Sequence, residues 1–374
     1  MNESIRELFP ALRRYAYLNS AAVSPIPVSA IEAVNVQLKD VSEHGSTNYP
    51  EWVATKNRSR ALVAEMLNVD PVNVAFTRNT SDGFAAIAAG IEWKPSDNIV
   101  TFHREFPANF YPWRSVRDRY GVEVRLCPER EGRMELEEFI GLIDENTRLV
   151  SISAVQFSTG YRADLERIGE AAHAVGALFA VDVIQGLGAM PFDLPGCNVD
   201  LASGASHKWL CAPEGCGILY VSDSARDRVT PSLVGWISVE EPWDFKDLDQ
   251  RYKPNALAWE SGTGASSLFY GLEQSLKLLI GTGIGLIESH LAELSDYLCE
   301  GLSFRNYKII SSRQPGEKSQ IVSVKPPEGQ TSDDIFKKLE SENVIVSSRS
   351  GILRISPHFY NVKEDIDRLV DALP

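Results

Sequence analysis

The chain has 374 residues, 44% of them hydrophobic, which is long and apolar enough for two domains with sizeable cores. Its formal net charge of -14 repels phosphate backbones and anionic lipids, and no run approaches the roughly 18 apolar residues of a membrane span, so nucleic acids and membranes are not expected partners. The five cysteines form no paired spacing and the six histidines no metal-ligand spacing, which favours reduced thiols in a cytoplasmic protein and disfavours a metal site.

The first two thirds of the chain alternate between short apolar strands and helices. Residues 76–91, "FTRNTSDGFAAIAAGI", predict a strand, a turn and a small-residue helix. Further strands are predicted at 98–102, 122–127, 148–155, 177–183, 199–205 and 217–221, with helices at 134–144 and 164–176. This alternation predicts an α/β fold whose mostly parallel sheet is covered by helices on both faces and binds ligands at the carboxyl ends of its strands.

The pattern changes after about residue 265. Two long helices are predicted at 267–280 and 286–302, and a last helix from Asn361, with Asn361 as N-cap and Glu364 three residues on. Strand-like segments at 307–311, 320–325, 344–348 and 352–356 surround a helix at 332–343. We therefore expect an N-terminal segment, 1–24, packed on the small domain, a large α/β domain, 25–264, and a small α+β domain, 265–374.

Two residues at the predicted ligand-binding edge can carry chemistry. Asp182 lies near the end of the apolar run "ALFAVDVIQ", where a cationic partner would keep it ionised; for this residue taken alone, a structural ion pair or a helix cap is the more common explanation. Lys208 lies between two strands, in "SGASHKWLCAPEGCGILYV". A desolvated lysine loses its proton more readily and attacks carbonyl carbons, whereas the alternative is an ordinary surface lysine in a loop.

Three further segments add candidate ligand contacts. Thr80 and Ser81 begin a small-residue helix whose free N–H groups could seat a phosphate, although a simple capped helix has the same pattern. Phe106 and Asn109 follow strand 98–102, where an aromatic ring could stack on a planar ligand or belong to the core. Arg354 lies within an apolar strand and could hold a carboxylate bidentately or form a structural pair.

These features occur in the order of a known family. The order along the chain is a candidate phosphate-binding helix start, the aromatic Phe106, "AVDVIQG", "SHKW" and the strand that contains Arg354. In this order, from "YLNSAA" to "LRISPHFYN", the chain resembles the class V aminotransferases. These are pyridoxal-phosphate (PLP) enzymes of fold type I and include the cysteine desulfurases. The resemblance implies a large PLP-binding domain, a smaller C-terminal domain and an enzyme acting on an amino acid.

The resemblance also implies residue roles around the cofactor. Lys208 would form a Schiff base with PLP, and Asp182 would hold the proton on the pyridinium nitrogen so that the ring accepts electrons from a substrate carbanion. Phe106 would stack on the ring, Gln185 would hydrogen-bond its phenolic oxygen, and Arg354 would bind the substrate's α-carboxylate. The phosphate would be held by the remaining polar residues: Thr80, Ser81, His207 and either Ser203 or Ser206.

The substrate side chain and the assembly are less well marked. We expect loops and the segment around residues 19–22 to contact the side chain of the substrate. Asn19 and Asn109 are the candidate substrate-binding residues. In the related enzymes the threonine of a Gly-Thr pair reaches the phosphate of a neighbouring subunit. That pair is Gly262-Thr263 here, which implies a homodimer.

The resemblance departs from the desulfurases at two places. The stretch "NVIVSSRSGILRIS" before the arginine strand has no catalytic cysteine, and Phe106 replaces their ring-stacking histidine, so a persulfide-forming desulfurase is disfavoured. We rank transamination first, with cysteine or selenocysteine lyase, epimerase and kynureninase-like hydrolase chemistry as alternatives. An α/β binding protein without turnover is a further alternative. A nicotinamide-dependent enzyme is disfavoured because no glycine-rich dinucleotide-binding motif follows an early strand. The one similar stretch, "GTGIG" (281–285), follows a helix.

Overall fold

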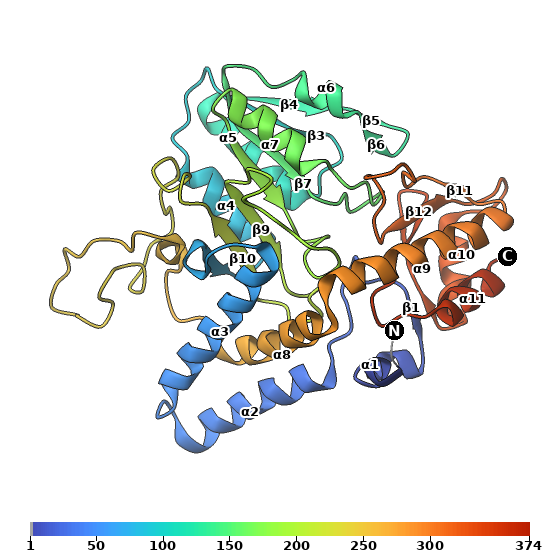
Figure 1. Cartoon of the computed structure of the whole chain (residues 1–374), viewed down its shortest axis with the longest axis horizontal. Helices are drawn as coiled ribbons and strands as arrows, with labels where there is room; N and C mark the ends of the chain where they lie inside the picture. Colours follow the sequence, from blue (N-terminus) through green and yellow to red (C-terminus); the bar gives the residue numbers. More distant parts are fainter. Residues whose placement is uncertain (1–2) are drawn as a thin grey trace.

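A computed structural model describes residues 3–374, and a seven-stranded sheet forms its centre (Figure 1). The strand order is β2-β10-β9-β8-β7-β3-β4; β10 is antiparallel to both neighbours and the other neighbouring pairs are parallel. The predicted mostly parallel α/β sheet is therefore confirmed. Its strands are β2 (Val74–Thr77), β3 (Asn98–Phe102), β4 (Glu123–Cys127), β7 (Thr147–Ser153), β8 (Leu178–Asp182), β9 (Leu201–Ala205) and β10 (Gly217–Val221).

Both faces of this sheet are buried because its central strands are apolar on both sides. In β8, Phe179 and Val181 belong to one buried cluster, while Leu178 and Ala180 belong to another. Helices cover both faces, and short 3-10 turns and a small hairpin fill the connections. These elements are α4 (Thr80–Gly90), α5 (Tyr111–Tyr120), α6 (Leu136–Ile140), α7 (Leu165–Ala174), η2 (Pro71–Asn73), η3 (Pro107–Asn109), β5 (Glu129–Arg130) and β6 (Arg133–Met134).

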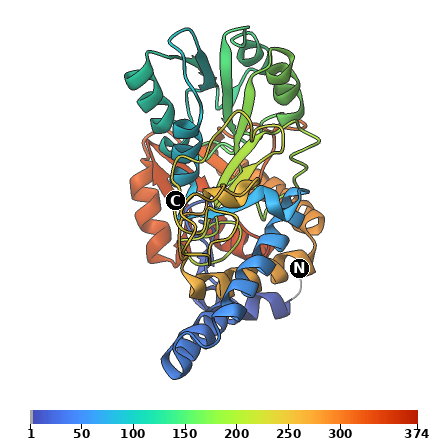
Figure 2. The same cartoon turned by 90° about the vertical axis from the view of Figure 1, so that its left-hand side faces the viewer.

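Two long helices precede the sheet, and the sequence patterns did not predict them. They are α2 (Val28–His44) and α3 (Tyr49–Leu67), and both pack on α8 (Ser266–Thr282). In both views α2 extends away from the sheet at the bottom of the molecule (Figures 1 and 2). Its apolar residues do not follow a single face: Ile31, Val36 and Leu38 are exposed in the single chain. The amphipathic pattern that identifies a helix is therefore blurred.

A second, antiparallel sheet lies in the C-terminal third, with the order β11-β12-β15-β14. The N-terminal segment joins this region, because Ala16 and Leu18 belong to its buried cluster and β1 pairs with β13. Its elements are β1 (Ala16–Tyr17), β11 (Lys308–Ile309), β12 (Val322–Lys325), β13 (Val344–Ile345), β14 (Ser347–Arg349), β15 (Ile352–Ile355), α9 (Ile284–Phe304), α10 (Ser332–Ser341) and α11 (Lys363–Ala372), with α1 (Glu3–Glu7) and η1 (Pro10–Arg13) at the start of the chain.

Most predicted elements differ from the observed ones by a residue or two at their ends, and two helices differ in ways that local contacts explain. The helix predicted at 134–144 is reduced to α6, which ends against Gly141. The last helix begins at Lys363 with Val362 as its N-cap, rather than at Asn361. The Asn361 side chain instead accepts from the backbone N–H of His358, at 2.8 Å, and so closes the preceding turn. Residues 1 and 2 of the predicted N-terminal segment lie outside the described residues, and the predicted domain division stays a prediction.

A long connection links β10 to η4 (Ala256–Trp259). Over the described stretch 222–255 it contains isolated bridges but no helix or strand, and it projects to the left in Figure 1. None of the described helices combines the length and the apolar character that crossing a bilayer requires.

Candidate active site

A cavity of about 320 Å³ opens at the carboxyl ends of the parallel strands, and we call it the Lys208 cavity. Its position follows from the topology, because β3, β8 and β9 run in the same direction and end at one edge of the sheet. The structure brings together here most of the residues that the sequence suggested for a cofactor and substrate: Thr80, Ser81, Phe106, Asp182, Gln185, His207, Lys208 and Arg354.

Asp182 is the last residue of β8 and is only 1% exposed. One carboxylate oxygen, Oδ1, accepts a hydrogen bond from the backbone N–H of Ile184 at 2.9 Å. The other, Oδ2, is buried and has no hydrogen-bond partner among the described residues. Burial raises the pKa of Asp182, and nearby Glu105 adds to this effect, while Lys208 and the Ile184 N–H oppose it. Lys208 therefore does not offset the cost of burying this carboxylate.

Lys208 lies three residues beyond the end of β9 and is 8% exposed. Its Nζ lies 5.5 Å from the centroid of the Phe106 ring, so the amine and the aromatic residue face each other in the cavity. Burial lowers the pKa of Lys208; Asp182 opposes this shift, whereas Arg354 and Arg349 reinforce it. A lowered pKa increases the neutral fraction of the amine, which is the nucleophilic form.

The amino end of α4 forms the phosphate-sized part of the site. Asn79 caps this helix by accepting from the backbone N–H of Asp82 at 2.9 Å. Within the described chain the Thr80 hydroxyl is buried without a partner. Burial, reinforced by Lys208, lowers the pKa of His207, which keeps its imidazole neutral and able to donate one hydrogen bond. First-turn N–H groups beside hydroxyls and an imidazole suit a phosphate dianion.

Gly83 lets this helix approach the sheet. A Cβ at Gly83 would lie only 2.1 Å from the Oγ atom of Ser203 on β9. The close approach of α4 to β9 places the helix start beside the cavity.

Gln185 and Phe157 complete the walls. The Gln185 amide donates to the carbonyl of Ala21 at 3.1 Å and accepts from Trp209 Nε1 at 2.8 Å, which fixes its orientation. Its second N–H remains available for a ligand, since an amide carries two donor hydrogens. The Phe106 and Phe157 rings meet edge to face at 5.1 Å, so Phe106 is supported from the protein side.

Arg354 lies on β15 and is 2% exposed. Its Nη1 donates to the Phe157 carbonyl at 2.9 Å, whereas its Nε and Nη2 have no partner in the part of the chain that the structure describes. Burial lowers the pKa of Arg354, and Arg349 adds to this, yet a guanidinium remains charged. A buried, half-satisfied guanidinium that lines a cavity suits a carboxylate ligand.

The sequence did not point to two charged residues here, one that lines the cavity and one that is buried behind it. Arg349, at the end of β14, lines the Lys208 cavity. Glu105, directly before Phe106, is buried and accepts from the Ser153 N–H at 2.9 Å, from Gln156 Nε2 at 2.6 Å and from Asn109. Burial raises the pKa of Glu105. In the sequence, only its position next to Phe106 could have pointed to Glu105.

Four predicted residues do not face the cavity. The Asn109 amide is held in the core, where Trp113 and Ser151 donate to its oxygen at 3.1 and 2.6 Å. The Ser203 hydroxyl donates to the Thr80 carbonyl at 3.1 Å, beneath α4. The Ser206 hydroxyl donates to the Pro213 carbonyl. The backbone of Asn19 forms a β-bridge with Ser356, and its side-chain Oδ1 is buried without a partner among the described residues. Of the residues described, none of Asn19, Asn109, Ser203 and Ser206 is among those lining the cavity.

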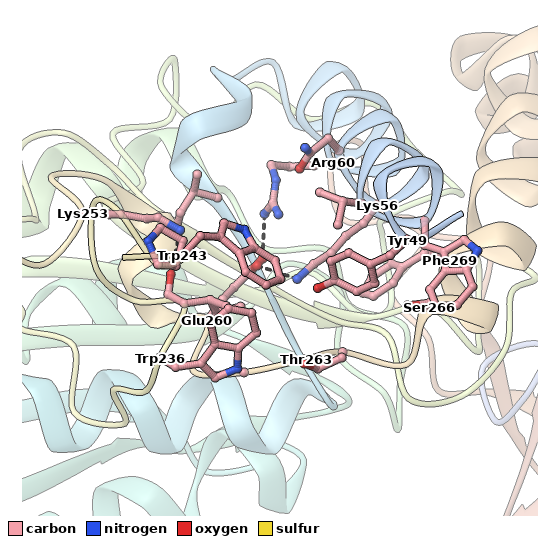
Figure 3. Close-up of a pocket in the computed structure, with 18 residues that line it drawn as sticks. Tyr49, Lys56, Arg60, Trp236, Trp243, Lys253, Glu260, Thr263, Ser266 and Phe269 are labelled. Carbon is pink, nitrogen blue, oxygen red and sulfur yellow. Dashed lines mark hydrogen bonds and ion pairs between the residues drawn. The ribbon is translucent and has the colours of Figure 1, made fainter. Parts of the chain in front are cut away.

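Thr263 lines a different cavity, of about 240 Å³, together with Tyr49, Trp236 and Trp243 (Figure 3). Beside it, the buried carboxylate of Glu260 accepts from Lys56 at 2.5 Å and from Arg60 at 2.7 Å. The predicted role of Thr263 requires a second copy of the chain, and within one chain it stays a prediction.

The residues of the Lys208 cavity fit PLP. The buried Asp182 Oδ2 suits a protonated pyridine nitrogen, the Lys208 amine suits an aldehyde carbon, Phe106 suits the ring face and the start of α4 suits the phosphate. No group of three or more His, Cys, Asp or Glu residues within the described chain could hold a metal ion.

Comparisons with known proteins agree on one family. The model of the family described as Aminotransferase class-V matches residues 16–369. A "Probable cysteine desulfurase" of Methanothermobacter thermautotrophicus is 27% identical over 395 residues, covering 99% of this chain and 97% of the relative. The "Uncharacterized aminotransferase YcbU" of Bacillus subtilis is 26% identical, with coverage of 99% and 97%.

Solved structures share the fold. The apo cysteine desulfurase of Thermococcus onnurineus has a TM-score of 0.90 at 23% identity, covering 99% of this chain and 97% of that one. The cystine C-S lyase C-DES, in complex with cysteine persulfide, has a TM-score of 0.90 at 23% identity, covering 98% and 100%. Together with the observed topology, these similarities confirm the fold class predicted from the sequence.

Proposed function

Because this chain belongs to the class V aminotransferase family, we propose that it transfers amino groups from an amino acid with the help of PLP. Family membership confirms the resemblance drawn from the sequence and, with it, a PLP-dependent enzyme of amino-acid chemistry. One observation carries the proposal: the buried Asp182 Oδ2 and the desolvated Lys208 amine lie in one cavity with Arg354.

Each residue has a defined task in this proposal. Arg354 binds the substrate's α-carboxylate through its Nε and Nη2 groups and so orients the α-carbon. Lys208 Nζ, with its lowered pKa, takes the proton from that carbon and returns it. PLP, when bound, supplies an electron sink for the negative charge left at the α-carbon, and Asp182 preserves this capacity by keeping the ring nitrogen protonated.

We rank transamination above desulfuration because the cavity contains, among the described residues, no side chain that would accept sulfur from a substrate. Across the described residues that line the Lys208 cavity there is no cysteine, so no thiol is placed to accept sulfur from a substrate. Ser350 and Gly351 form a short turn where the desulfurases carry their cysteine loop. Amino transfer would require only that Lys208 moves this proton, while PLP, when bound, would accept the amino group and water would supply the oxygen of the keto-acid product.

Elimination at a C–S bond remains the second candidate. It requires the same base and no protein thiol, and the cystine C-S lyase shares the fold. A panel of amino acids with a keto-acid acceptor, assayed for amino transfer, ammonia and sulfide, separates the two. Amino transfer without sulfide supports the proposal. Ammonia or sulfide without amino transfer overturns it in favour of the lyase.

We further propose a homodimer in which Thr263 of each copy approaches the phosphate site of the other. Large apolar side chains support this, because they are exposed in the connection beside Thr263: Trp243 is 63% and Leu248 94% exposed. Exposed apolar patches of this kind mark association surfaces. Light scattering after size-exclusion chromatography should give twice the chain mass; a monomer at micromolar concentration would refute this assignment.

Two further expectations belong with this proposal. A large domain of 25–264 and a small domain of 265–374 with the segment 1–24 are supported by the separate sheets and the separate cluster of the C-terminal region. A cytoplasmic location is supported by five cysteines that are all free thiols.

A further inference from the structure

Arg349 is a second arginine at the Lys208 cavity, and its placement is fixed by a tight hairpin. The β14–β15 connection consists of Ser350 and Gly351, whose φ angles are +50° and +77°. Positive φ at both residues is the geometry of a two-residue hairpin turn that matches the strand twist. The backbone therefore holds Arg349 at the strand end, directly across from Ile352.

The strand register also places both arginines on one face of the small sheet. Ser347 lies opposite Arg354, and Arg349 lies opposite Ile352. Side chains two residues apart on a strand share a face, so Arg349 and Arg354 project to the same side as diagonal neighbours. Both line the Lys208 cavity, Arg354 as a buried wall residue and Arg349 as an exposed one.

The charges of this cavity do not balance around a simple amino acid. Its lining residues carry three cationic groups, Lys208, Arg354 and Arg349, and one carboxylate, Asp182. Arg349 donates from Nε to the Ser347 hydroxyl at 3.3 Å and forms no ion pair with any described residue. Asp182 suits the ring nitrogen of PLP, and the start of α4 suits its phosphate. Two guanidinium groups therefore remain for the substrate.

We infer that the substrate is an amino acid whose side chain ends in a carboxylate, and that Arg349 is the residue that recognises this second anion. The inference rests on the proposed function, in which Arg354 takes the α-carboxylate. A neutral amino acid would satisfy Arg354 and leave Arg349 without a partner. A dicarboxylic amino acid satisfies both, and a planar guanidinium fork suits a carboxylate.

The first test measures binding without turnover. Succinate and propionate differ by one carboxylate and lack an amino group, and their dissociation constants for the PLP-loaded enzyme are obtained by calorimetry. The wild type should bind succinate about tenfold or more tightly than propionate, as expected for one charge-assisted contact. Arg349→Gln should remove this preference while leaving propionate binding unchanged, and Arg349→Lys should restore part of it.

The second test measures selectivity. With aspartate against asparagine, and glutamate against glutamine, Arg349→Gln should lower the ratio of kcat/KM values about tenfold, mainly through KM for the acidic member. Arg119→Gln is the matched control, since Arg119 is an exposed arginine on α5 that does not line the cavity, in the chain as described. It should change neither ratio.

The outcomes separate this inference from the proposed function. Amino transfer from neutral amino acids at rates that Arg349→Gln does not alter would overturn the inference and leave the function standing. If Arg349→Gln lost the preference for succinate but no amino acid supported amino transfer, Arg349 would be supported as the residue that binds the second carboxylate, and the proposed aminotransferase function would be overturned. Equal binding of succinate and propionate by the wild type would refute the role of Arg349 outright.

Discussion

Asp182→Asn separates the stability of the protein from its affinity for the cofactor. Asparagine has nearly the same shape and can still accept the Ile184 N–H, but it carries no charge. Burial raises the pKa of Asp182. At any pH where the carboxyl is ionised in the unfolded chain, its burial therefore lowers the free energy of unfolding of the cofactor-free protein. The substitution should therefore stabilise the cofactor-free protein and weaken PLP binding.

The sign of the pH dependence follows from the raised pKa. The stabilising contribution of a carboxyl with a raised pKa is fully present below its usual value, about pH 4, and is lost as pH rises through the raised pKa. Between those limits, the free energy of unfolding of cofactor-free Asp182→Asn should increase relative to the wild type. Because Glu105 and Lys208 also face this group, the difference between variant and wild type is the quantity to follow.

The magnitudes come from the contacts of the carboxylate. Asparagine also leaves one buried polar atom without a partner among the described residues, so the substitution relieves only the extra cost of burying the charge, about 1–3 kcal/mol near neutral pH. The lost pairing with a cationic ring nitrogen is worth about 1.5–3 kcal/mol, or roughly ten- to a hundredfold in the dissociation constant of PLP. The two effects have opposite signs, which is the distinctive feature of this prediction.

Urea denaturation of cofactor-free protein from pH 4 to pH 8, together with fluorescence titration with PLP, measures both effects. Asp200→Asn provides a matched control, because Asp200 is equally buried but accepts from the Phe179 N–H and from His173, each at 2.9 Å. That variant should lose stability and keep its affinity for PLP. If Asp182→Asn behaved like Asp200→Asn, the assigned role of Asp182 would be refuted.

Three further predictions concern other parts of the structure. Arg354→Gln should weaken α-amino acid binding by about 2–5 kcal/mol, as for a truncated buried charge pair, visible as a raised KM; an unchanged KM would remove Arg354 from the site. Glu260→Gln should lower the free energy of unfolding by about 3–5 kcal/mol at neutral pH. Burial alone would raise the pKa of Glu260, but Arg60 and Lys56 hold it at about 2. The stability that Glu260 contributes is therefore lost as pH falls from the usual glutamate pKa toward 2. A difference between variant and wild type that does not change with pH would contradict this assignment. Gly83→Ala should cost about 1–3 kcal/mol in urea denaturation and weaken PLP binding, because its Cβ would lie 2.1 Å from Ser203 Oγ; full stability would show that α4 can shift without consequence.

The parts of the site that the sequence predicted are those set by strand topology. Asp182 ends β8 and Lys208 follows β9, and these two parallel strands end at one edge of the sheet, so the alternation of strands and helices was sufficient to bring them together. Arg354 belongs to a different sheet. Its place in the cavity came from the family resemblance, because no local pattern relates the two sheets.

The parts that could not be predicted depend on side-chain direction. Asn109 follows β3 as expected, but the turn at Pro107 directs its amide toward Ser151 and the core. The Ser203 side chain points from β9 toward α4 rather than into the cavity. Arg349 was overlooked because its relation to Arg354 depends on strand register, which a short loop in the sequence does not reveal. Helix α2 was missed because part of its apolar surface is exposed in the single chain.

Reductive trapping tests the central claim most directly. The purified protein, incubated with PLP and reduced with borohydride, should lose its visible absorption band and carry one pyridoxyl group per chain on the peptide that contains Lys208. Label on another lysine, or no visible band and no label, would contradict the assignment of the Lys208 cavity as the cofactor site.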